Sequence, residues 1–189
     1  MLRRLLIVFV IALAVAPSAF AKGGTYVFAG GTRAEQGQVK AALDASSFDF
    51  SVVPSTVTIH IARNSASDAT PGNIYLDSGL LDAGRFSWGV VQHEFAHQVD
   101  FLVLSDAARA RLQSALGGSA WCAGATHSQL ACERFADLVS WAYWQSPDNA
   151  MKPASAADEG GQLTPAAFRA LLTQLLPQRT LSVHPPRNR

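Results

Sequence analysis

The stretch WGVVQHEFAHQVDFLVL, residues 88–104, is apolar and long enough to form a buried helix against which the rest of the chain can pack. Within it stands His93-Glu94-Phe95-Ala96-His97, an H-E-x-x-H pattern. On an α-helix, positions four apart differ by about 40° around the axis and about 6 Å along it. His93 and His97 therefore project from one face, where both imidazoles can bind one metal ion. Glu94 can then reach a water molecule beside that ion.

The segments on either side of this helix predict a small sheet before it and more helices after it. Short β-branched or aromatic runs predict three strands, at residues 25–29, 57–62 and 73–77. Apolar spacing and capping residues predict helices at 32–45, 86–104, 105–117, 129–145 and 164–176. We therefore expect an α+β fold. A small sheet of about three short strands packs on the H-E-x-x-H helix, and a mainly helical C-terminal half follows.

The strand at 73–77 lies directly ahead of the H-E-x-x-H helix in the sequence. It could form the edge of the sheet along which an extended peptide pairs, or it could be an inner strand or an extended segment. The polar residues 63–72 before it predict a loop. His60, in the preceding strand, is most simply a strand residue without a metal role.

The start of the chain has the pattern of a targeting signal, expected at residues 1–21. Arg3 and Arg4 precede an apolar run that is too short for a comfortable membrane span, and Ala19-Phe20-Ala21 is an A-x-A cleavage site. We expect an exported protein, secreted or periplasmic, without stable membrane insertion after cleavage. An uncleaved N-terminal anchor is the alternative. Residues 22–189 are expected to form one domain with a mobile tail from about residue 178.

Charge and cysteine content narrow the class further. The 189 residues carry a formal net charge of +1 and no long basic run, which gives no reason to expect a nucleic-acid partner. We expect a monomer. The two cysteines, Cys122 and Cys132, predict one disulfide in an exported protein. Metal ligation is the alternative, but the C-x-x-C spacing typical of thiolate sites is absent.

A catalytic zinc ion usually has three protein ligands, so a third ligand must come from elsewhere in the chain. Asp100 lies on the same helix face as His93 but about 10 Å further along the axis. It fits better as a hydrogen-bond partner of His97 or of a neighbouring loop. His127 and Glu133 are the other candidates. A carboxylate in a stretch as apolar as 129–145 needs a partner, and a metal ion supplies one, which favours Glu133.

Asp137 lies one helical turn after Glu133 and faces the same way. It can accept a hydrogen bond from the second ring nitrogen of a ligand histidine and so orient the ring. Alternatively, both acids lie on an ordinary solvent-exposed face of the helix.

At these residues the chain resembles the gluzincin metallopeptidases, and most of all the small lethal-factor-type and Pro-Pro endopeptidase domains. The resemblance rests on the H-E-x-x-H-x-x-D pattern of residues 93–100 and on Glu133-Arg-Phe-Ala-Asp137. It implies that His93, His97 and Glu133 are ligands of one catalytic Zn²⁺. It also implies that Glu94 is the general base and that Asp137 supports the ligands.

One departure from that family concerns the oxyanion. The family places a tyrosine several residues before the third ligand, whereas this chain has Thr126-His127-Ser128. We expect His127 to stabilise the oxyanion, because an imidazole N–H can donate to developing negative charge. Tyr143 and Tyr75 are weaker candidates, and an ordinary surface role for His127 is the alternative.

Together these features predict an exported zinc endopeptidase that acts on a peptide or protein substrate, with Glu94 carrying protons. Two alternatives remain, a secreted protein in which zinc only joins two helices and an inactive metallopeptidase relative. Large aromatic side chains near the motif are candidates for the specificity pocket, although such residues are more often in the core. They are Phe86, Trp88 and Trp141.

Overall fold

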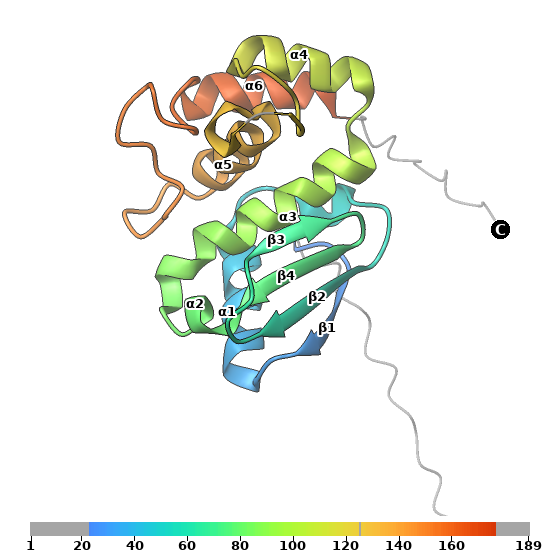
Figure 1. Cartoon of the computed structure of the whole chain (residues 1–189), viewed down its shortest axis with the longest axis vertical. Coiled ribbons are helices and arrows are strands. Elements are labelled where there is room, and N and C mark those ends of the chain that lie inside the picture. Colours follow the sequence, from blue (N-terminus) through green and yellow to red (C-terminus); the bar gives the residue numbers. More distant parts are fainter. Residues whose placement is uncertain (1–22, 125, 177–189) are drawn as a thin grey trace, which may run out of the picture.

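The computed structural model describes residues 23–124 and 126–176 of the chain. The expected signal peptide and the tail from residue 178 lie outside these residues. Within them the fold is α+β, as the sequence predicted: a small sheet, a long helix packed on it, and a helical C-terminal half (Figure 1). No helix in the described part of the chain is long and apolar enough to span a membrane.

The sheet has four strands where the sequence predicted about three. They are β1 (Tyr26–Gly30), β2 (Val57–Ala62), β3 (Asp68–Thr70) and β4 (Asn73–Asp77). Their order is β1-β2-β4-β3, with β1, β2 and β4 parallel and β3 antiparallel to β4. The three predicted strands are present within one residue of their expected ends.

The fourth strand, β3, overturns the prediction of a loop over residues 63–72. Its three residues, Asp-Ala-Thr, carry no hydrophobic alternation, so only their pairing with β4 makes them a strand. This pairing also shows that the predicted strand at residues 73–77 is not at the edge of the sheet. Asn73–Asp77 is an inner strand between β2 and β3, and β3 is the edge next to the long helix.

Two helices cover one face of the sheet. Helix α1 (Arg33–Ala45) begins with a capping box between Thr32 and Glu35, as predicted. Helix α3 (Trp88–Val103) carries the H-E-x-x-H pattern and runs alongside β3, at one edge of the sheet, in Figure 1. Before it come the short helix α2 (Ser78–Leu81) and 3₁₀ turns at Phe50–Val52 and Gly84–Ser87.

The helical half lies on the other side of α3. It consists of α4 (Asp106–Leu116), a 3₁₀ turn at His127–Gln129, α5 (Ala131–Tyr143) and α6 (Pro165–Leu175). Helix α5 packs along α3, and α4 and α6 pack on α5. Phe95 of α3 and Phe135 of α5 are fully buried on either side of this junction. Helix α3 is thus the shared wall of both halves, and residues 91–100 are all buried.

Because α3 is buried on all sides, each of its polar side chains needs a partner. Gln92 donates to the carbonyl of Ala42 in α1 at 2.7 Å. Gln98 donates to the carbonyls of Thr70 and Asn73 and accepts from the amide of Gly72, at 2.8 to 3.0 Å. These bonds hold the β3–β4 turn against the helix one residue after His97.

Candidate metal centre

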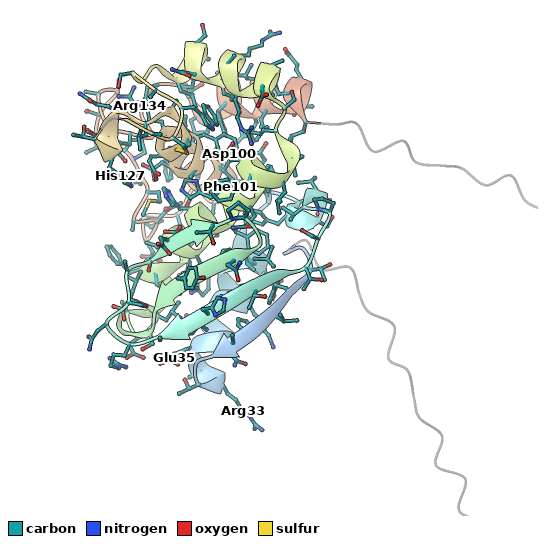
Figure 2. All side chains as sticks on the ribbon, turned by 45° about the vertical axis from the view of Figure 1, so that its right-hand side comes forward. Arg33, Glu35, Asp100, Phe101, His127 and Arg134 are labelled. Atoms are coloured by element: carbon teal, nitrogen blue, oxygen red, sulfur yellow. A yellow bond between two sulfur atoms is a disulfide. The ribbon has the colours of Figure 1, made fainter. Side chains whose placement is uncertain are left out.

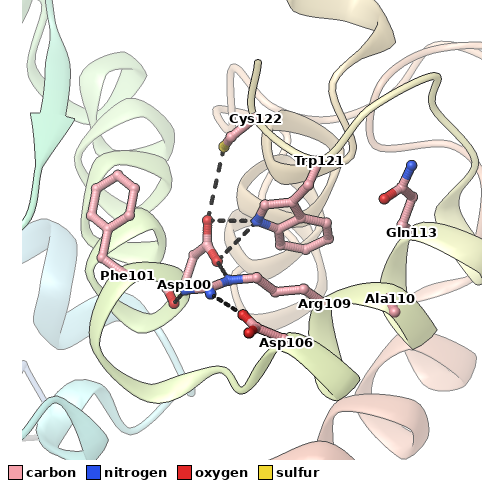
Figure 3. Close-up of a pocket in the computed structure, with 8 residues that line it drawn as sticks. All are labelled: Asp100, Phe101, Asp106, Arg109, Ala110, Gln113, Trp121 and Cys122. Carbon is pink, nitrogen blue, oxygen red and sulfur yellow. Dashed lines mark hydrogen bonds and ion pairs between the residues drawn. The ribbon is translucent and has the colours of Figure 1, made fainter. Parts of the chain in front are cut away.

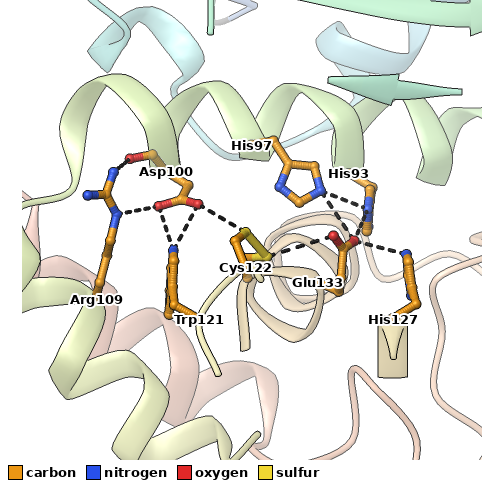
Figure 4. Close-up of a disulfide and its surroundings, with 9 residues drawn as sticks. His93, His97, Asp100, Arg109, Trp121, Cys122, His127 and Glu133 are labelled. Atoms are coloured by element: carbon orange, nitrogen blue, oxygen red, sulfur yellow. Dashed lines mark hydrogen bonds and ion pairs between the residues drawn. A yellow bond between two sulfur atoms is a disulfide. The ribbon is translucent and has the colours of Figure 1, made fainter. Parts of the chain in front are cut away.

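Two imidazole nitrogens from α3 and one carboxylate oxygen from α5 lie close together beside the sheet (Figure 4). Nε2 of His93 lies 3.1 Å from Nε2 of His97. Oε2 of Glu133 lies 3.2 Å from the first nitrogen and 3.3 Å from the second. The helical spacing brings the two histidines together, and the packing of α5 along α3 adds the carboxylate.

This triangle has the dimensions of a tetrahedral zinc site. Ligand atoms about 2.0–2.1 Å from a tetrahedral zinc ion lie about 3.3 Å from one another. The three observed separations, 3.1, 3.2 and 3.3 Å, are close to that value. Two imidazole nitrogens and one carboxylate oxygen are also ligands that zinc prefers. The residues present therefore fit a divalent metal ion. Zinc is one such ion, and other divalent ions bind such ligand sets too.

Asp137 contacts the first histidine, the position from which the sequence expects it to orient the ring. Its Oδ1 lies 2.8 Å from Nδ1 of His93, and both side chains are buried. A hydrogen bond from Nδ1–H to this carboxylate fixes the ring so that Nε2 faces Glu133 and His97. The second histidine has no such support, because Nδ1 of His97 has no hydrogen-bond partner among the described residues.

Charge in the cluster is unbalanced without a cation. Burial opposes a positive His93, but hydrogen bonds with Asp137 and Glu133 outweigh it and raise the pKa of His93 to about 10. Burial likewise opposes a charged Glu133, yet hydrogen bonds from His93 and His97 hold the pKa of its carboxyl well below the usual range. The surrounding acids thus attract positive charge to this point, which a proton or a metal cation can supply.

Glu94 lies beside the triangle and faces a cavity of about 340 Å³. A carboxylate oxygen of Glu94 and one nitrogen each of His93 and His97 all lie within 4.8 Å of one another. Burial raises the pKa of Glu94 above its ordinary value, although the nearby His93 partly opposes this. Such a carboxylate takes up a proton more readily than an exposed one does.

His127 reaches the same cavity from the 3₁₀ turn that precedes α5. Its Nε2 lies 3.1 Å from Oε2 of Glu133, and its Nδ1 lies 3.3 Å from Oε2 of Glu159. Figure 2 shows His127 at the junction between the sheet and the helical half. The structure therefore places His127 at the candidate site. The two weaker candidates do not line the cavity: Tyr143 packs on Phe48, and Tyr75 stacks on His60.

Asp100 does not support His97, which corrects one of the two roles expected for it. Its carboxylate accepts from the indole N–H of Trp121 at 3.0 and 3.1 Å and from Nε of Arg109 at 2.7 Å (Figure 3). The axial distance along α3 carries the short side chain past His97 to the loop before α5. Asp100 is thus the partner of a neighbouring loop, the other role that the sequence allowed.

The predicted disulfide between Cys122 and Cys132 is present. It lies between the Asp100 group and the candidate metal site (Figure 4). Sγ of Cys132 is 3.7 Å from Oε1 of Glu133. This sulfur forms a second possible ligand group with His97 and Glu133, but while it is bonded to Cys122 it has no thiolate to offer.

Sequence reasoning missed several residues that line the cavity. Ser67 to Ala69, at the edge strand β3, form one wall, and Phe101 and Cys122 form another. None of the aromatic residues proposed for a specificity pocket, Phe86, Trp88 and Trp141, lines it. Phe101 lies one turn after His97 on the same helix, so its spacing could have pointed to it. Glu159, which contacts His127 from a loop, has no comparable spacing to the motif.

Comparisons with protein-family models, with curated proteins and with solved structures gave no significant match. The buried His93 and His97 of α3 and the partly buried Glu133 of α5, with Glu94 beside them, could hold a metal ion at the wall of a cavity.

Proposed function

We propose that this protein is an exported zinc-dependent endopeptidase of the gluzincin type. The observation that carries the proposal is the triangle of His93, His97 and Glu133, with the buried carboxylate of Glu94 beside it at a cavity. The chemistry that fits this combination is hydrolysis by a metal-assisted water molecule. The internal disulfide is compatible with an oxidising compartment outside the cytoplasm.

His93, His97 and Glu133 would hold one zinc ion, with Asp137 orienting His93. When bound, zinc polarises a carbonyl oxygen and lowers the pKa of a water molecule. Glu94 takes the proton from the attacking water, whose oxygen forms a bond to the carbonyl carbon. As the C–N bond breaks, Glu94 delivers the proton to the leaving amine nitrogen. Its raised pKa suits both transfers.

The position of the edge strand β3 is a further argument for a peptide substrate. Asp68 and Ala69 of this strand line the same cavity as His93 and Glu94, and the side of β3 away from β4 has no neighbouring strand in the described sheet. An extended peptide can pair with such an edge through main-chain hydrogen bonds. Gln98 holds the β3–β4 turn in place beside the cavity.

On the α5 side of the cavity lies His127, which we propose stabilises the oxyanion. Its ring lines the cavity from the α5 side, and its Nδ1 lies 3.3 Å from Oε2 of Glu159. An N–H of this ring would donate to the charge that develops on the carbonyl oxygen.

Cleavage of a diverse peptide mixture, read by mass spectrometry, tests the proposal. The chain from Lys22 onwards is compared with a Glu94→Gln variant of equal zinc content. We expect cuts that the variant does not make, and their flanking residues would report the specificity. If two zinc-loaded proteins gave the same peptides, the proposal would be wrong for the peptides in the mixture.

One observation favours a second function, a zinc ion that only joins α3 to α5. His127 is close enough to Glu133, at 3.1 Å, to be considered as a fourth ligand that closes the site. Its side chain is 67% exposed and also contacts Glu159, which fits a mobile donor better than a buried ligand. A His127→Ala variant separates the two. Loss of turnover with zinc retained favours the peptidase, and loss of zinc favours the closed site.

A further inference from the structure

The two sulfur atoms of the disulfide have different surroundings. Cys122 is exposed and lines the cavity at the candidate metal site as well as the neighbouring one bounded by Trp121. Cys132, on the first turn of α5, is fully buried. A thiol from solution can therefore reach the sulfur of Cys122, but not that of Cys132.

The buried sulfur is next to the metal ligands. Sγ of Cys132 forms a group with one nitrogen of His97 and one oxygen of Glu133 in which all three atoms lie within 4.8 Å. Sulfur and nitrogen ligands of a tetrahedral zinc ion lie about 3.6 Å apart. Rotation about the Cα–Cβ bond of a released Cys132 moves its sulfur relative to these two atoms.

From these positions we infer that Cys132 is a latent fourth metal ligand, which attack by a small thiol on Cys122 releases. The thiolate of the reagent bonds to Sγ of Cys122, and the S–S bond breaks. The bonding pair remains on Sγ of Cys132, which leaves as a thiolate beside His97 and Glu133. The reagent is oxidised to a mixed disulfide on Cys122, and Cys132 is reduced.

Hydrogen bonds besides the disulfide hold the segment around Cys132. The amide of Cys132 donates to the carbonyl of Trp121 at 3.0 Å, and the amide of Ala131 donates to that of Ala120 at 2.9 Å. The indole of Trp121 is bonded to Asp100 on α3. We expect these contacts to keep Cys132 in its buried position after exchange. Its thiolate then lies beside the metal ligands and not in solvent.

The consequence is an enzyme that works only when the disulfide is intact. A catalytic zinc site keeps one position open for water, and a thiolate in that position excludes the water. Reducing conditions, such as those before export, would thus hold the protein as a tightly metallated, inactive form. This inference rests on the metal site of the proposed function.

Two matched variants test the inference with Co²⁺ in place of zinc. Cys122→Ala and Cys132→Ala both lack the disulfide, and each keeps one thiol. We expect a thiolate-to-cobalt charge-transfer absorption in the near ultraviolet for Cys122→Ala and not for Cys132→Ala. With zinc, we expect peptide cleavage by Cys122→Ala to be slower by about tenfold or more, because its open position is filled.

Wild-type protein provides the same test if either variant does not fold. Glutathione should add to Cys122, seen by intact mass and peptide mapping, and the cobalt absorption should appear with it. Disulfide-bonded wild type that binds Co²⁺, with no thiolate absorption in Cys122→Ala or after glutathione addition, would overturn the inference and leave the proposed function standing. Wild type that binds no metal would overturn both.

Discussion

Nδ1 of His93 lies 2.8 Å from Oδ1 of Asp137, which ties α3 to α5 one helical turn away from the contact between His93 and Glu133. The same two helices thus supply both the expected ligands and the group that orients one of them. His97 has no equivalent partner among the described residues. The site is therefore held more firmly on the His93 side.

Replacing Asp137 by Asn should weaken metal binding. An amide cannot fix the His93 tautomer as a carboxylate does, and loss of such a partner typically costs about 10–100-fold in metal affinity. Competition with a chromophoric zinc chelator measures the effect. Asp158→Asn, on an exposed loop, is the control and should bind zinc like the wild type. Equal affinities for Asp137→Asn and the wild type would contradict the orienting role.

Replacing Glu94 by Gln should abolish proton transfer and spare metal binding, since Glu94 is not one of the three proposed ligands. We expect kcat to fall by about 10²–10⁴-fold, the usual contribution of a general base. Stopped peptide assays on protein of measured zinc content give this ratio. A variant that lost its zinc would show instead that Glu94 is a ligand.

The stability of the metal-free protein should fall as the pH rises from 6.5. The pKa of His93 is raised from 6.5 to about 10 in the folded state, so the protonated ring stabilises the fold. This contribution is complete below pH 6.5 and is lost as the pH approaches 10. Thermal melts in the presence of a chelator measure it, and Asp137→Asn should flatten the curve.

Zinc should reverse that trend, because a cation on Nε2 replaces the proton. Ligands that bind only the folded state stabilise it in proportion to their affinity, and zinc binds the unprotonated imidazole. The gain in melting temperature on adding zinc should therefore grow between pH 6.5 and pH 8. A gain that shrank over this range would argue against zinc on His93.

Replacing Gln98 by Ala should loosen the edge strand without disturbing the cluster. Gln98 is fully buried, and its side chain makes three hydrogen bonds to the β3–β4 turn. Leaving such backbone groups unpaired costs about 1–3 kcal/mol. Chemical denaturation measures the loss. If β3 pairs with the substrate, KM for a peptide should rise while zinc content stays equal, and an unchanged KM would exclude that pairing.

Several features could be predicted because they depend only on residues close together in the chain. Helix α3, the shared face of His93 and His97, and the capping box of α1 each follow from contacts within one or two turns. The disulfide followed from a count, since a chain with two cysteines can form only one internal pair. The fold class followed from the order of strand and helix patterns.

The remaining features depend on how the elements pack, and the sequence carries little trace of that. The sequence favours Glu133 over Asp100 as the third ligand, but it does not show how α5 packs on α3. Only the rotation of α5 against α3 places Glu133 beside both rings, while Asp100 turns to Trp121 and Arg109. The edge strand β3 likewise exists only through its pairing with β4.

Local sequence is thus enough to predict two imidazoles on one helix face with a carboxylate beside them, and to name Glu133, Asp137 and His127 as candidate partners. Only the packing of α5 and its preceding loop on α3 brings these groups and the sulfur of Cys132 to the histidines. The difference lies in the range of the interactions. Helical geometry is set by hydrogen bonds four residues apart, whereas contacts between elements are set by the packing of whole surfaces.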